Sequence, residues 1–305
     1  MSRERRMVEP LEPRSYYGRP VLKQPVWTPE VPTYFWTGGL AGASAALAFG
    51  ADLAGERVLA RRAWLGALAG VAASPPLLIS DLGVPRRFLN MLRVFKVTSP
   101  MSVGSWLLAA VGPAVAVATA SDLTGRHRRA GRAAGAGAAL LGLPLATYTG
   151  ALLANTAVPV WHEARRELPF VFAASASATA GAAAALTTPS AHAAPARALA
   201  LGGSVAELAL ARLMEQRLGE LGDPYHRERA GRYSRLAKGA LATGALALGA
   251  RRRPSGPGDR AVTVAGAALV MTGSLLERWA IFRAGFQSAA DPRYTVGPQR
   301  ARHGS

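Results

Sequence analysis

The sequence predicts an all-α integral membrane protein with eight transmembrane helices arranged as two four-helix bundles. Half of the 305 residues are hydrophobic, yet 36 Lys and Arg against 18 Asp and Glu give a net charge of +18. A soluble domain does not combine these properties easily, whereas alternating apolar and basic segments in a membrane protein do. The apolar segments are also about 20 residues long, the length needed to cross a hydrocarbon core of about 30 Å.

Eight apolar segments have this length, and Ala and Gly fill them more than Leu and Ile. The seventh is the weakest, because the stem of Lys238 has to extend toward the lipid headgroups. Gly38 with Gly42, and Gly66 with Gly70, have the spacing that lets helix backbones approach closely. The predicted spans are residues 31–54, 62–83, 99–121, 133–157, 167–188, 196–216, 236–250 and 261–282.

These spans divide the chain into four expected parts. Residues 1–30 form a polar arm that docks on a partner subunit, and residues 31–157 form the first bundle. Residues 158–283 form the second bundle, and residues 284–305 a polar tail. Repeated prolines keep the arm extended, which suits docking, although a disordered tail is the alternative.

An even number of spans places both termini on one side of the membrane, here called the terminal side. Its tails and loops carry more Lys and Arg than the loops of the opposite side. Because positive charge favours the cytoplasm, we expect the terminal side to be cytoplasmic, in the inner (plasma) membrane of the cell.

Composition excludes several classes of site and partner. The chain has no cysteine, so it cannot hold a disulfide, a Cys-ligated zinc or an iron–sulfur cluster. Its five histidines fall outside the predicted spans, which excludes a two-histidine haem and argues against a buried metal site. Basic residues lie in short clusters between apolar segments, a pattern that fits the lipid bilayer and partner subunits rather than nucleic acid.

Polar residues converge on the terminal side of the first five spans. Each has an ordinary interpretation as a helix cap, an aromatic-belt residue or, for Asp81, a partner of Arg86 or Arg87. Tyr148 differs, because it lies deeper than an aromatic belt and a buried phenol needs a partner. With a carboxylate it could hold a quinone carbonyl and pass protons to it. The candidate quinone-binding residues are Tyr148, Asp81, Tyr34, Thr33 and Asn155.

Three carboxylates form a candidate proton path. Glu207 lies near the middle of the sixth span, Asp52 near the opposite-side end of the first, and Glu163 in a terminal-side loop. A carboxylate within the membrane indicates proton conduction or an ion pair. The alternative for Glu207 is a structural pair with a cross-helix cation such as Lys238.

Three segments resemble the NrfD/PsrC family of polysulfide-reductase membrane subunits. They are DLGVPRRFLNMLRVFKVTSPMSVGSW from Asp81 to Trp106, YTGALLANTAVPVWHEARRELPFVF from Tyr148 to Phe172, and YFWTGGLAG from Tyr34 to Gly42. The resemblance implies an eight-helix subunit without prosthetic groups, partnered by a ferredoxin-like iron–sulfur subunit and often a molybdopterin catalytic subunit.

The same resemblance bears on individual residues. Tyr148 matches the tyrosine that contacts menaquinone in that family. The family's histidine and asparagine contacts in the first helix have no identical match, and Thr33 and Tyr34 stand at the corresponding turn.

The leading hypothesis is therefore a quinone-reactive membrane subunit, without a redox centre of its own, in a respiratory electron-transport complex. It would exchange electrons between the iron–sulfur partner and menaquinone or ubiquinone. One alternative is a passive membrane anchor. Another is a secondary transporter, although the two halves show no internal repeat.

Overall fold

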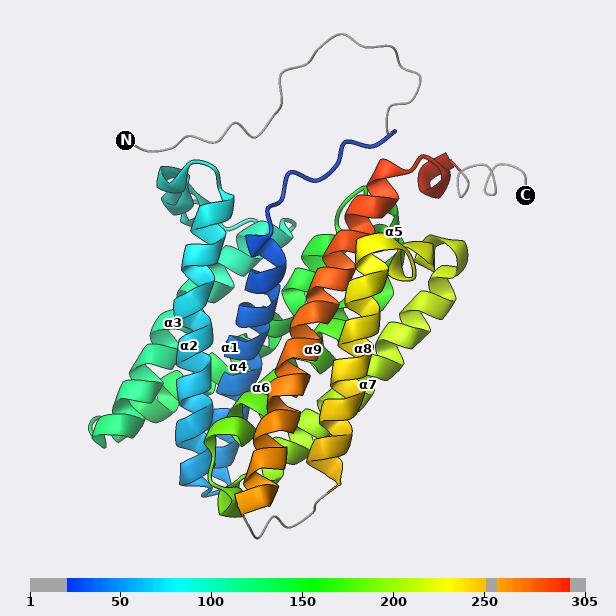
Figure 1. The fold of residues 1–305 in the computed structure, drawn as a ribbon. Coiled ribbons are helices and arrows are strands. Elements are labelled where there is room, and N and C mark those ends of the chain that lie inside the picture. Colours follow the sequence, from blue (N-terminus) through cyan, green and yellow to red (C-terminus); the bar gives the residue numbers. More distant parts are fainter. Residues whose placement is uncertain (1–20, 251–256, 297–305) are drawn as a thin grey trace.

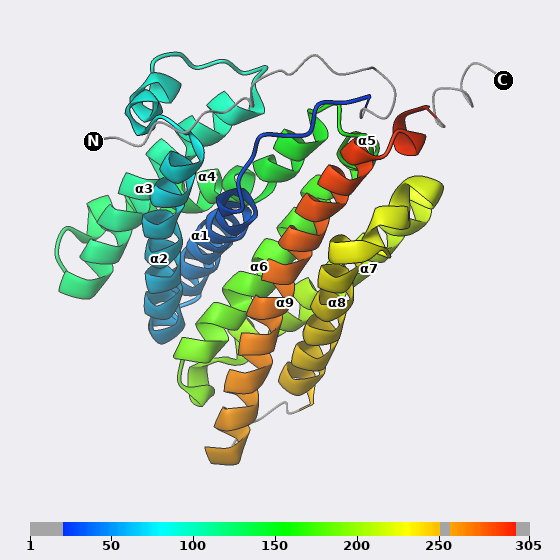
Figure 2. The ribbon, with the colours of Figure 1, turned by 45° about the horizontal axis from the view of Figure 1, so that its top comes forward.

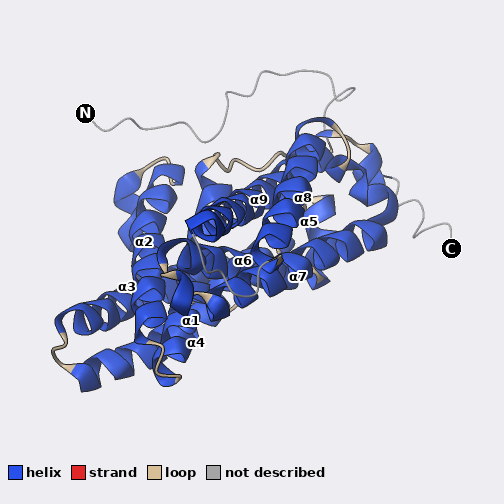
Figure 3. Cartoon of the chain, turned by 60° about the horizontal axis from the view of Figure 1, so that its bottom comes forward, coloured by secondary structure: helices blue, strands red, loops and turns tan. Residues whose placement is uncertain are grey.

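The computed structural model describes residues 21–250 and 257–296, and within these ranges the chain is helical without any strand (Figure 3). Five helices are long and apolar enough to cross a membrane. The prediction of an all-helical membrane protein is confirmed to this extent, whereas the eight spans and two bundles remain predictions. The five are α2 (Arg57–Asp81), α3 (Pro100–Thr124), α4 (Arg128–Ala154), α6 (Leu168–Thr187) and α9 (Pro257–Ala290).

Three further helices are long but are not apolar enough to be counted among these five. They are α1 (Glu30–Leu53), α7 (Ala194–Leu218) and α8 (Glu228–Gly249). Each of the eight predicted apolar segments thus falls on one long helix. The two largest boundary differences are equal. Helix α9 ends at Ala290 instead of 282, and α8 begins at Glu228 instead of 236 because Arg229, Arg232 and Arg235 continue the helix although they do not suit a membrane.

Short helical elements connect the long ones. On the terminal side, η1 (Pro85–Leu92) follows α2, α5 (Pro159–Glu163) and η2 (Ala164–Arg166) follow α4, and η4 (Gly219–Tyr225) follows α7. On the opposite side, η3 (Ser190–His192) joins α6 to α7.

The long helices lie side by side, with α2 and α3 at one edge and α7 and α8 at the other (Figures 1 and 2). Helix α1 packs against α2 and α4, and α3 packs mainly against α4. Helix α6 contacts α1 and α4 as well as α7 and α9, and α8 pairs with α9. The start of α1 and the end of α9 lie at the same end of the molecule, the terminal side (Figure 1).

Backbone contact between glycines holds α1 against α4. A Cβ atom built on Gly142 would lie 2.6 Å from the carbonyl oxygen of Gly42, and one on Gly42 would overlap Gly142 in turn. Gly70 makes a similar contact, with its Cβ position 2.7 Å from the carbonyl oxygen of Thr37. Gly38 and Gly66, the other members of the predicted spacing pairs, meet only side chains.

We predict that Gly142→Ala destabilises the protein while Gly137→Ala does not. Both residues lie in α4, but the Cβ position of Gly137 has no atom within 4 Å. Overpacking at Gly142 is expected to cost about 1–3 kcal/mol. Thermal unfolding of the two variants in one detergent measures the difference, and equal melting temperatures would contradict the contact.

Candidate functional site

Tyr34 of α1 and Tyr148 of α4 meet through their hydroxyl groups, which form a hydrogen bond. The Tyr34 side chain is buried, and Tyr148 is partly exposed. Two residues 114 positions apart in the chain, both selected from the sequence, therefore form one pair. Since one phenol donates to the other, the accepting phenol keeps its own O–H free for a further acceptor.

A glycine in α3 makes room for this pair. A Cβ atom built on Gly104 would overlap the ring and hydroxyl of Tyr148. No sequence pattern indicates this role, because Gly104 resembles the other small residues of its helix.

A second set of buried hydroxyls lies deeper between α1 and α2. The Thr37 and Ser74 hydroxyl oxygens are 3.0 Å apart. Thr37 also donates to the carbonyl oxygen of Tyr34 at 3.2 Å, and Ser74 donates to that of Gly70 at 2.8 Å. These hydrogen bonds fix the backbone next to the tyrosine pair, on the side deeper in the membrane.

Asp81, at the end of α2, binds the N-terminal arm. Its Oδ1 atom accepts hydrogen bonds from the Thr28 backbone N–H at 2.9 Å and from the Thr28 hydroxyl at 2.6 Å. The sequence suggested Arg86 or Arg87 as its partner, but in the described structure the partner is Thr28. Asp81 therefore holds the chain that leads into α1.

The neighbouring residue of the arm is held from the other half of the molecule. Trp27 stacks on Trp161 of α5, with ring centroids 5.5 Å apart. Trp161 is fully buried and donates from Nε1 to the carbonyl oxygen of Ile281 in α9 at 2.8 Å. Gly285 leaves the space that the Trp161 indole fills. Residues 1–20 of the predicted docking arm lie outside the described residues.

Thr33 and Asn155 are not part of the tyrosine pair. Thr33 is half-buried in the first turn of α1, and Asn155 is exposed at the C-terminal end of α4. Both lie closer to the terminal side than Tyr34 and Tyr148 do.

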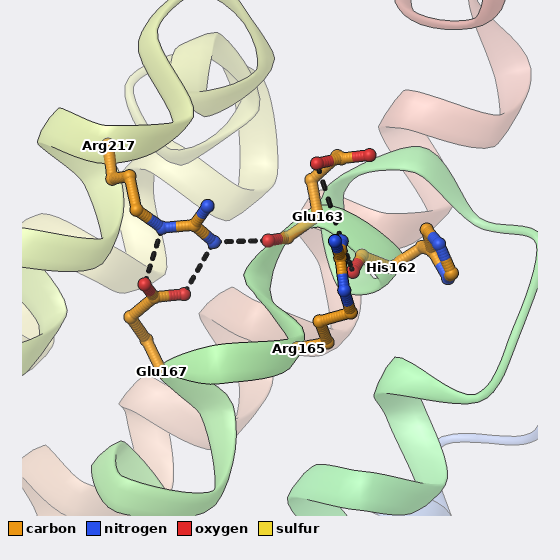
Figure 4. Close-up of polar contacts among 5 residues, drawn as sticks. All are labelled: His162, Glu163, Arg165, Glu167 and Arg217. Carbon is orange, nitrogen blue, oxygen red and sulfur yellow. Dashed lines mark hydrogen bonds and ion pairs between the residues drawn. The ribbon is translucent and has the colours of Figure 1, made fainter.

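Glu163 lies in a surface network on the terminal side (Figure 4). Arg165 Nη1 is 3.5 Å from its Oε2 atom. Arg217 at the end of α7 donates to the Glu163 carbonyl oxygen and forms an ion pair with Glu167, with Nη2 to Oε2 at 2.6 Å. His162 is exposed. This network ties the α4–α6 connection to α7.

A buried charge cluster, defined as Glu207, Ser274, Glu277 and Arg278, lies between α7, α9 and α6. All four side chains are buried. Glu207 Oε2 accepts a hydrogen bond from Ser274 at 2.8 Å. Arg278 Nη2 donates to the carbonyl oxygen of Phe172 at 3.0 Å, and the guanidinium carbon lies 3.6 Å from the centroid of the Phe172 ring.

Ionisable groups continue from this cluster to the terminal-side surface. Neither carboxylate oxygen of Glu277 has a hydrogen-bond partner among the described residues. Burial raises the pKa of Tyr225 well above its ordinary value, and the nearby carboxylates of Glu277 and Glu215 add to this effect. Glu215 pairs with Lys238 at 2.7 Å and lies 3.8 Å from Nε2 of His226, a side chain that is 63% exposed.

The cluster extends the sequence interpretation of Glu207. Lys238, considered from the sequence as the cation for Glu207, pairs with Glu215 instead. Glu277 and Arg278 were not identified as site residues, although two charged residues inside an apolar segment are a recognisable signal. Asp52 lies elsewhere, in a pocket at the opposite side.

Comparison with known proteins gives one family. A family model described as Polysulfide reductase (NrfD_2) matches residues 15–222, more than half of the chain. This range includes Tyr34, Asp81, Tyr148 and Glu207, and it ends before α8 and α9. No curated protein matches the chain.

We predict that Asp81→Ala exposes the arm to protease. Removing the carboxylate removes both hydrogen bonds to Thr28, and each hydrogen bond to a charged group contributes about 1.5–3 kcal/mol. Trypsin should then cut after the exposed Lys23 at least tenfold faster than in the unaltered protein. Asp122→Ala, which removes a carboxylate at the opposite side, serves as the control, and equal cleavage rates in both variants would contradict this anchoring.

Proposed function

The chain belongs to the polysulfide reductase (NrfD) family, whose members are membrane subunits of redox complexes, and from this we propose that it is the quinone-reactive subunit of a multisubunit oxidoreductase. It exchanges electrons between an iron–sulfur partner subunit and menaquinone or ubiquinone. In this proposal all eight long helices cross the plasma membrane, as the bundles α1–α4 and α6–α9, with the termini in the cytoplasm.

The electrons have to come from a partner. The chain has no cysteine and so no thiolate to ligate an iron–sulfur cluster. We infer a ferredoxin-like iron–sulfur subunit on the terminal side, with a molybdopterin catalytic subunit behind it. Reduction of one quinone to quinol then takes two electrons from that partner and two protons through this chain.

The observation that carries the proposal is the tyrosine pair. Tyr34 is buried and Tyr148 partly exposed, so the favoured arrangement has Tyr34 donating to Tyr148. The Tyr148 O–H is then directed to a quinone carbonyl, and Tyr34 fixes its orientation. In the reverse direction the donor and acceptor exchange roles: the quinol O–H donates to the Tyr148 oxygen, and Tyr148 donates to Tyr34.

The remaining candidate residues have supporting roles. Asp81 holds the arm through Thr28, which fixes the start of α1 and hence Tyr34. Thr33 and Asn155 lie nearer the terminal side, and we assign them to the entrance of the site.

Protons reach the site through the second half of the molecule. The buried charge cluster has two carboxyl groups for one guanidinium, and burial of a net charge is costly. A proton on one carboxyl group restores neutrality, and Glu277, with no hydrogen-bond partner among the described residues, is able to take it up and release it. The proposed proton route runs from His226 and Glu215 by way of Tyr225 to Glu277 and Glu207. Glu163 and Asp52 lie outside this route and only accept protons at the surface.

Replacing Tyr148 with Phe tests the quinone site. The variant keeps the ring but loses the donor, and one lost hydrogen bond costs about 1 kcal/mol, or more if a buried acceptor is left unpaired. Quinone-dependent turnover of the assembled complex should fall several-fold or more. Reduction of a soluble dye by the partner subunits should not change.

Two further variants complete this test. Tyr34→Phe should reduce quinone turnover less than Tyr148→Phe, because the direct donor remains. Tyr233→Phe, in α8 away from the pair, should leave turnover unchanged. Full quinone turnover in an assembled Tyr148→Phe complex would favour the passive-anchor alternative.

Replacing Glu277 with Gln tests the proton route. Gln keeps the size of the side chain but cannot carry a proton, so quinone turnover should fall, and more steeply as pH rises because protons become scarcer. Glu220→Gln, at an exposed position of η4, is the control. A variant with an unchanged pH profile but a lower melting temperature would show that Glu277 serves structure alone.

A further inference from the structure

A basic pocket of about 700 Å³ lies at the opposite side, where the α1–α2 connection faces the α3–α4 connection. It shares no residue with the tyrosine pair or the buried charge cluster. Two carboxylates, Asp52 and Asp122, also line it. The arginines that line this pocket are Arg57, Arg61, Arg62, Arg128, Arg129 and Arg132.

Most of this positive charge is not neutralised within the protein. Arg61 pairs with Asp122, with Nε to Oδ2 at 3.0 Å, and also donates to the Asp122 carbonyl oxygen at 3.0 Å. The other five arginines are exposed, and the described residues supply them with no ion-pair partner. An anion in the pocket would meet several guanidinium groups, which suit phosphate oxygens in particular.

Two helix N-termini add to the positive potential. Helix α2 begins at Arg57 and α4 at Arg128, and both residues line the pocket. Neither helix has a side-chain hydrogen bond at its N-cap, where Glu56 and His127 stand. Free N–H groups at a helix start attract anions, and here two such starts border the same cavity.

The wall of the pocket that lies deeper in the membrane is apolar. Phe49 and Trp64 line it, packed over Gly135, whose Cβ position lies 3.1 Å from the Trp64 ring. Leu53 and Leu123, at the ends of α1 and α3, are exposed by 59% and 50%. The pocket is charged at its opening, at the helix ends, and apolar deeper in the membrane. This combination suits an amphiphile better than a free ion.

We propose that this pocket binds the phosphate headgroup of an anionic phospholipid, with the acyl chains lying along the apolar wall that Phe49 and Trp64 form. The bound phosphate would bridge the α1–α2 and α3–α4 connections, beside the Arg61–Asp122 pair that joins α2 to α3. The lipid would thereby stabilise the half of the molecule that holds the tyrosine pair.

The test measures the melting temperature of the full-length protein in mild detergent with added lipid. Cardiolipin or phosphatidylglycerol should raise it by several degrees, whereas phosphatidylcholine and inorganic phosphate at equal concentration should not. An equal shift with inorganic phosphate would assign the pocket to a free anion. An equal shift with phosphatidylcholine would show general lipid stabilisation, and either result would overturn the proposal.

Matched triple variants locate the effect. Arg57→Gln/Arg128→Gln/Arg132→Gln should abolish the shift caused by anionic lipid. The control triple removes the same charge from η1 and the residue after it, on the terminal side, and should keep the shift; it is Arg86→Gln/Arg87→Gln/Arg93→Gln. Equal loss in both triples would mean that net charge alone attracts the lipid.

A second readout covers the case in which the pocket triple does not fold. Native mass spectrometry of the single variant Arg132→Gln counts the anionic lipids that survive purification. We expect fewer retained lipids than in the unaltered protein and in Arg86→Gln. Equal retention in all three proteins would rule out the site.

Discussion

Direct contact between the backbones of small residues is the constraint on which this helix assembly depends. Among lipids, neighbouring helices gain little from hydrophobic burial, so association relies on close packing. Helix α1 meets α4 at Gly42 and Gly142, and α8 meets α9 at Gly244 and Gly266. The tyrosine pair follows from the first crossing. Tyr34 and Tyr148 each lie about two turns from it, on antiparallel helices and toward the terminal side, so the crossing brings them to one level.

The two halves of the molecule differ in the kinds of polar group that they bury. In α1–α4 the buried polar groups are hydroxyls, such as Thr37 and Ser74, which pair with each other or with backbone carbonyls. In α6–α9 buried charges accompany such hydroxyls, and Arg278 is held by a carbonyl oxygen and an aromatic face. Hydroxyls suit fixed positions, since their hydrogen bonds are local and neutral. Buried carboxyl groups suit proton exchange, because their charge depends on a proton.

Much of the helical framework could be predicted from the sequence, and the contacts between helices could not. Apolar length locates every long helix, but it places the start of α8 too late because four cations occupy its first half. Depth in the span singles out Tyr148. Its hydrogen bond to Tyr34 depends on how α1 crosses α4, and the Trp27–Trp161 stack joins residues that each look like ordinary interface tryptophans. Glu277 could have been identified from the sequence as an acid in an apolar segment. Its proximity to Tyr225 could not, because it depends on how α9 packs on η4.

The way in which the arm is held also sets an order in time. Thr28 can bind Asp81 as soon as α2 has been made, because only the first two helices are needed. The contact of Trp27 with Trp161 needs more of the chain than the contact of Thr28 does. Trp161 is oriented by its hydrogen bond to Ile281 in α9, the last long helix of the described chain. The contacts of Trp27 are therefore complete only after α9 has been synthesised and has packed. A partner that recognises the arm in this position would bind chains in which α9 has packed and would not bind chains that still lack α9.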